Sequence, residues 1–229
     1  MSEVTRKLSV VYLRAGRDAE AAAELDRIAR DSSYDFETRH AAIWEAAGLY
    51  QKTSDTAREA EALNYFLVSM NGSLDQGIDA RERLSAIADS AGDVATTQAW
   101  LGDIILAHEQ AAEPTQRSRS AAANSSLTLA DARLDDFMNI RLTVPLKENL
   151  QAKKQAMEGL LGAYGDAADY AVGPVTTAST YRIAELYREM AGALMTSERP
   201  PELNEAELEE YEFLLEEQAF PFEEKAIEV

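Results

Sequence analysis

Apolar residues recur along the first half of the chain with a period of 38 residues. Two columns of this register hold only large apolar residues: Leu25, Leu63 and Leu101, then Ile28, Phe66 and Ile104. The columns lie three residues apart, so within each pass they fall on one face of an α-helix. Three passes cover residues 1–110 and predict helices that bury a continuous stripe.

Each pass also contains a turn signal between two helical stretches. The residues at these turns are Gly16 with Asp18, Ser54 with Asp55, and Gly92 with Asp93. Glycine adopts the left-handed conformation that ends a helix, and an aspartate side chain accepts a hydrogen bond from the first turn of the next helix. The pattern therefore predicts three helical hairpins of the same construction.

The pattern Leu8-Ser9-x2-Tyr12-x3-Gly16-x4-Ala21-x3-Leu25 resembles the tetratricopeptide repeat (TPR). Ala46-Ala47-x2-Tyr50 and Leu84-Ser85-x2-Ala88 are weaker copies. The usual period of that family is about 34 residues, so the extra residues here are expected between the repeats. The resemblance implies an all-α fold, a TPR-like α-solenoid of antiparallel helical hairpins.

Residues 111–126 contain no large apolar residue and are predicted to form an exposed connector, either irregular or containing a short helix. Residues 127–229 return to helical patterns and are expected to form degenerate TPR-like hairpins. Thr128 and Asp131 resemble a capping box, and Asn204 is expected to cap a later helix. Pro145 and Pro221 each suit the first turn of a helix, since a missing N–H costs nothing there.

The last helical pattern has no stop signal before Val229, and the first begins with no capping repeat. We therefore expect a fragment of a larger array, truncated at the C-terminus. The segment from Thr180 to Ala226 also resembles the C-terminal parts of envelope-associated TPR proteins of Gram-negative bacteria. This resemblance implies a bacterial protein, periplasmic or envelope-associated in preference to cytoplasmic.

The charge of the chain limits the classes of partner. There are 22 Lys and Arg against 41 Asp and Glu, a formal net charge of −19 at pH 7. Such a surface repels the phosphate backbone, so nucleic-acid binding is not expected. No apolar run approaches the length of a membrane span. The absence of cysteine excludes disulfides, thiolate metal sites and thiol nucleophiles.

No catalytic motif stands out. His40 and His108 are the only histidines. Glu37 and His40 have the spacing used in di-iron bundles, but Ile105 stands three residues before His108, so the second pair is absent. We expect no cofactor, no metal site and no enzymatic activity within this chain.

In the TPR family, four positions on the first helix of each repeat line the concave face. Carried onto this register, they are Glu3, Arg6, Val10 and Leu13; Ala41, Trp44, Gly48 and Gln51; and Asp79, Glu82, Ala86 and Asp89. Of these, the candidate partner-binding residues are Arg6, Leu13, Trp44, Gln51, Glu82 and Asp89. Trp44 has two interpretations: beside Gly48 it forms a pocket for an apolar anchor, or it packs between hairpins, where large aromatic residues usually go. Trp100 is expected in the core.

The resemblance and the missing catalytic groups favour a protein–protein interaction scaffold. Its partner is expected to be a neutral-to-basic protein or peptide, because Asp79, Glu82 and Asp89 repel a carboxylate. Two alternatives stay open. One is a helical accessory region of a larger enzyme whose catalytic domain lies outside this chain. The other is self-association through the repeat ends.

Overall fold

The computed structural model describes residues 2–70 and 72–229, with side chains from residue 7 onward. These residues form α-helices joined by turns and loops, and no strand occurs among them. The expected all-α fold is therefore confirmed. The chain divides into two compact units, Met1–Ser118 and Arg119–Val229.

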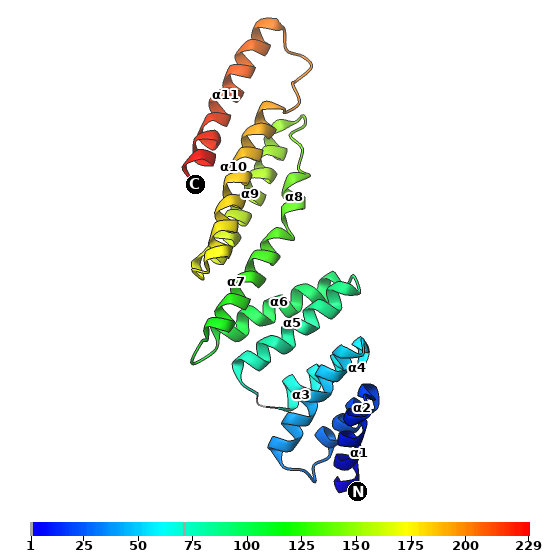
Figure 1. The fold of residues 1–229 in the computed structure, drawn as a ribbon. Helices are drawn as coiled ribbons and strands as arrows, with labels where there is room; N and C mark the ends of the chain where they lie inside the picture. Colours follow the sequence, from blue (N-terminus) through cyan, green and yellow to red (C-terminus); the bar gives the residue numbers. More distant parts are fainter. Residues whose placement is uncertain (1, 71) are drawn as a thin grey trace. The chain divides into compact units, whose positions relative to one another are not determined.

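Unit 1 (Met1–Ser118) contains successive helix pairs in which each helix packs against the next along the chain (Figure 1). Its helices are α1 (Ser2–Arg14), α2 (Asp18–Arg30), α3 (Phe36–Lys52), α4 (Thr56–Ser69), α5 (Leu74–Ser90) and α6 (Val94–Glu109). The short turns within the α1–α2, α3–α4 and α5–α6 pairs leave the two helices of each pair antiparallel.

The turn inside each pair has the same backbone geometry. Gly16, Ser54 and Gly92 have φ values of 69°, 58° and 73°, in the left-handed region that glycine adopts without steric cost. The next N–H then bonds the carbonyl oxygen five residues before it, as in many helix ends. These bonds, each 2.9 Å, join Arg17 to Tyr12, Asp55 to Tyr50, and Asp93 to Ala88. The predicted recurrence of the turn is confirmed.

The helix caps follow the prediction in two of the three turns. Asp55 and Asp93 are N-caps, and each accepts a hydrogen bond from the backbone N–H three residues later. Asp18 is not a cap: Arg17 holds that position without a side-chain bond, and Asp18 pairs with Lys52 Nζ at 2.6 Å. That prediction was wrong because the first turn has one more residue between the glycine and the acid.

The core of unit 1 lies between successive helices. Both predicted columns point into it: Leu25, Ile28, Leu63, Phe66 and Ile104 are buried, and Leu101 is half-buried. Alanines are buried beside them, including Ala22, Ala46, Ala47 and Ala80. Such small side chains let the helix backbones approach closely.

Residues 111–126 do not form the expected exposed connector. Most of them belong to helix α7 (Gln116–Asp131), and Ala121, Ala122 and Ala123 are buried. The prediction was wrong because it required large apolar residues for packing, whereas Ala123 packs with Ala167 and Val175. Thr128 lies within this helix and bonds the carbonyl of Asn124, so it is not a cap.

Unit 2 (Arg119–Val229) contains most of α7 together with four further helical segments (Figure 1). They are α8 (Leu134–Met138), α9 (Leu146–Asp169), α10 (Gly173–Met195) and α11 (Glu205–Glu228). Helix α10 packs against both α9 and α11. The expected cap is confirmed: Asn204 forms a capping box with Glu207 at the start of α11.

The two prolines that were expected in the first turns of helices differ in their positions. Pro145 is the residue directly before α9, close to its expected first-turn position. Pro221 does not open a new helix, because α11 runs through it without interruption. Pro221 has no N–H to donate to the carbonyl oxygen of Glu217, four residues earlier. Both residues are exposed, so water can donate to that carbonyl instead.

A buried lysine joins three helices of unit 2. The side chain of Lys153 on α9 is 1% exposed, and its Nζ lies 3.1 Å from Glu189 Oε1 on α10. The same ammonium donates to the carbonyl oxygens of Phe137 at 3.3 Å and Ile140 at 3.1 Å, at the end of α8. All three of its donors are used, which is the condition for burying an ammonium at a tolerable cost.

Candidate functional site

An open hollow of about 530 Å³ lies on unit 1. It is lined by α3, by the start of α4, by one face of α5, and by Arg117 from the first turn of α7. Its lining includes Trp44, Gln51, Glu59, Glu82, Arg83 and Arg117. The hollow thus combines an aromatic ring with several charged groups.

Trp44 forms the apolar wall. It is half-buried, and its ring lies 4.8 Å from that of Phe66, centroid to centroid, at a tilted angle of 48°. Trp44 lines the hollow and also a second one of about 590 Å³, which Gly48 and Ala41 line as well. Both sequence interpretations of Trp44 therefore describe part of its environment: it packs on the core, and it offers a surface beside Gly48.

A buried ion pair forms the base of the hollow. Arg83 Nε on α5 donates to Glu59 Oε1 on α4 at 2.8 Å, and Glu59 is 3% exposed. The Arg83 guanidinium also donates to the carbonyl oxygen of Ala47 on α3 at 2.7 Å. One side chain thereby connects three helices, which fixes the shape of the hollow.

Arg117 occupies the acidic rim. Its guanidinium lies 2.5 Å from Asp79 Oδ1 and also bonds both carboxylate oxygens of Glu82. The hydrogen bonds that Arg117 donates to Glu82, and then to Asp79, raise the pKa of its guanidinium above the ordinary value. All three side chains remain more than a third exposed, so solvent screens these contacts and they are exchangeable.

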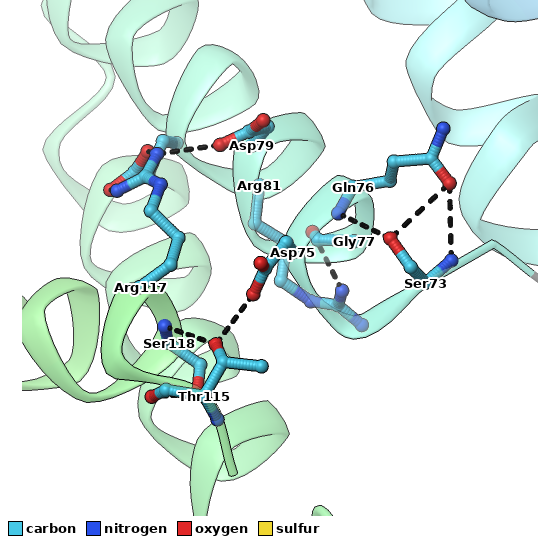
Figure 2. Close-up of polar contacts among 10 residues, drawn as sticks. Ser73, Asp75, Gln76, Gly77, Asp79, Arg81, Thr115, Arg117 and Ser118 are labelled. Atoms are coloured by element: carbon cyan, nitrogen blue, oxygen red, sulfur yellow. Dashed lines mark hydrogen bonds and ion pairs between the residues drawn. The ribbon is translucent and has the colours of Figure 1, made fainter.

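Arg117 is placed by a small polar network at the start of α7. Figure 2 shows Thr115 Oγ1 donating to Asp75 Oδ1 on α5, at 2.5 Å. The backbone N–H of Ser118 donates to Thr115 Oγ1 at 2.9 Å, and the Thr115 N–H donates to Ser118 Oγ at 3.0 Å. This capping arrangement ties the first turn of α7 to α5 and directs Arg117 toward Asp79.

The structure brings together part of the predicted set. Trp44, Gln51 and Glu82 line the hollow, whereas Leu13 on α1 and Asp89 on α5 do not. Arg6 lies in α1, and its side chain is outside those that the structure describes. Trp100 is half-buried and packs against the core, close to its expected place.

The sequence interpretation missed the basic side chains of the hollow. Arg117 was assigned to the connector, and Arg83 carried no pattern that distinguished it. A signal for Arg117 was nevertheless present, because Thr115 and Ser118 have the spacing of a helix cap. Recognising that cap would have placed Arg117 in the first turn of a helix.

The two histidines lie in different surroundings. His40 packs between the rings of Phe36 and Phe66, at centroid distances of 5.9 Å and 5.3 Å. His108 Nδ1 lies 2.8 Å from Ser118 Oγ. Within residues 2–70 and 72–229, no group of three or more His, Cys, Asp or Glu side chains is arranged to hold a metal ion.

No helix among the described residues is both long enough and apolar enough to cross a membrane. Comparison with family models and with curated proteins finds no match to this chain.

Proposed function

We propose that this protein is a non-catalytic interaction scaffold, a TPR-like α-solenoid that binds a protein segment in the hollow on unit 1. The observation that carries the proposal is the hollow itself, where Trp44, Gln51 and Glu82 from two successive first helices line one open space. The recurrence of one turn geometry at Gly16, Ser54 and Gly92 supports the repeat architecture.

The charges of the hollow favour a neutral-to-basic partner. Glu59 and Arg83 neutralise each other at the base. At the rim, two carboxylates face one guanidinium, so negative charge is in excess. A lysine or arginine of the partner can replace Arg117 beside Glu82, while an apolar side chain packs on Trp44.

The test is a selection of peptides from a random-sequence display library, with the full chain as bait. Selected peptides, each labelled with fluorescein, are then titrated with the full chain, and the anisotropy of the label reports binding. We expect the selected peptides to combine basic residues with an apolar anchor.

Three variants locate the site. Trp44→Ala and Glu82→Lys should each weaken binding about tenfold or more, as expected when an anchor or a charge partner is lost. Asp89→Lys makes the same charge change on the same helix but outside the hollow, so it should bind as well as wild type. If the peptides bind Trp44→Ala and Glu82→Lys with the same affinity as wild type, the proposed binding site is refuted.

A further inference from the structure

Helix α11 is apolar on two opposite sides. On its inner side, Leu215 and Ala219 are buried against α10. On its outer side, Phe213, Phe220 and Ile227 are 59%, 55% and 86% exposed. A helix that covers a core needs only one apolar side, so the outer residues require another explanation.

The outer residues form an ordered stripe. They are spaced by seven residues, and seven residues at 100° each return to within about 20° of the starting direction. Leu215 lies about 200° from Phe213 on this helix, so the stripe faces away from α10. The stripe therefore supplies one apolar position per heptad, as each of the two apolar positions does in a coiled coil.

Glutamates border the stripe on both sides. These side chains, all exposed, are Glu209, Glu210, Glu216, Glu217, Glu223, Glu224 and Glu228. None of them forms an ion pair with another residue in the described part of the chain. The outer side of α11 therefore combines an uncovered apolar stripe with uncompensated negative charge.

We propose that the outer side of α11 binds a basic amphipathic helix of a partner protein, through an apolar stripe flanked by lysine or arginine. Burial of Phe213, Phe220 and Ile227 provides the affinity, and the flanking glutamates select the charge of the partner. A second α11 packed against the same face would bring like charges together. An anionic lipid surface would be repelled in the same way. The site lies on unit 2 and does not depend on the hollow on unit 1.

The test uses a synthetic peptide of about 21 residues, or three heptads, with leucine at the a and d positions and lysine at the flanking e and g positions. A fluorescein label on the peptide reports binding to the full chain by anisotropy. Wild type should bind it with a Kd on the order of 10 μM, weakening as the salt concentration rises. Phe220→Ser and Ile227→Ser should each weaken binding about tenfold.

Val68 on α4 supplies a matched control. It is an aliphatic residue with 87% of its surface exposed, against 86% for Ile227. Val68→Ser should therefore bind the peptide as wild type does, while far-ultraviolet circular dichroism confirms that all variants stay folded. Equal binding by Phe220→Ser, Ile227→Ser and wild type would overturn the proposal.

A charge reversal tests the selectivity. The triple variant Glu216→Lys, Glu217→Lys and Glu224→Lys should lose the basic peptide and bind a peptide with glutamate in place of lysine. Undiminished binding of the basic peptide by this variant would overturn the role of the glutamates. Two other results would overturn the proposed occupant: wild type forming oligomers that Phe220→Ser disrupts in sedimentation velocity, or wild type binding phosphatidylserine vesicles through this face.

Discussion

The ion pair between Glu59 and Arg83 should be the most sensitive polar contact of unit 1. Arg83→Met keeps most of the side-chain volume and removes the guanidinium. Glu59, only 3% exposed, then stays buried without its cation, and the Ala47 carbonyl loses its donor. Because these groups belong to three different helices, the loss affects the whole α3–α4–α5 assembly.

The magnitude follows from the burial of the pair. Removing one partner of a buried ion pair costs about 3–5 kcal/mol. The Arg83 side chain is 17% exposed, so some water can reach the abandoned carboxylate. We therefore expect the lower end of the range, about 3 kcal/mol less free energy of unfolding. Replacing both partners, in Glu59→Leu with Arg83→Met, should restore stability to within about 1 kcal/mol of wild type.

Urea unfolding followed by tryptophan fluorescence is the appropriate assay. Trp44 and Trp100 are the only tryptophans and both belong to unit 1, so the signal reports that unit alone. Arg58→Met is the control, because Arg58 pairs with Asp55 at 3.6 Å on the surface and should cost less than about 0.5 kcal/mol. A cost below about 1 kcal/mol for Arg83→Met, or a double variant no more stable than the single one, would contradict this reasoning.

Three further predictions concern single positions. Ser54→Gly should raise the free energy of unfolding by about 0.5–1 kcal/mol in the same urea assay, because the φ of 58° strains any residue with a Cβ. Lys153→Met should lower stability by about 2–3 kcal/mol, followed by circular dichroism, since two carbonyl oxygens and Glu189 lose their donor. Hydrogen bonds from the Thr96 side chain and backbone lower the pKa of Asp93, so its contribution to stability is complete above the unfolded pKa of about 3.9 and is lost as pH falls through the folded value. Thermal melts between about pH 5 and pH 3 should therefore show a steeper loss for wild type than for Asp93→Asn, which still caps the helix but carries no charge to titrate.

The hairpins were predictable because their turns are encoded locally. Gly16 and Gly92 mark left-handed positions by residue type alone, and the register adds Ser54 to the same set. The apolar columns were predictable for a similar reason, since residues three apart share a helical face. Helix α7 was missed because its buried residues are alanine and serine. These residue types are also common in exposed segments, so the sequence does not mark them as buried.

The hollow was only partly predictable from the register. Its lining on α5 follows one helical face through Asp79, Glu82, Arg83 and Ser90. Asp89 is seven residues after Glu82 and lies about 20° from it around the helix, yet it does not line the hollow, although the concave positions implied by the TPR resemblance include it. Arg117 was beyond the register altogether, since it comes from a later helix and approaches Glu82 only in the folded chain.

The alanine face of α7 has a consequence for mutational tolerance. Ala122 and Ala123 have no exposed surface, and Ala123 is enclosed by Ala167 and Val175, with Leu127, Tyr170 and Val172 packed against this cluster. Exchange for serine or glycine changes little volume, whereas valine or leucine would force the helices apart. In most protein interiors, replacing a large side chain by a small one is the more destabilising change. On the buried face of α7, replacing a small side chain by a large one would be the more destabilising change.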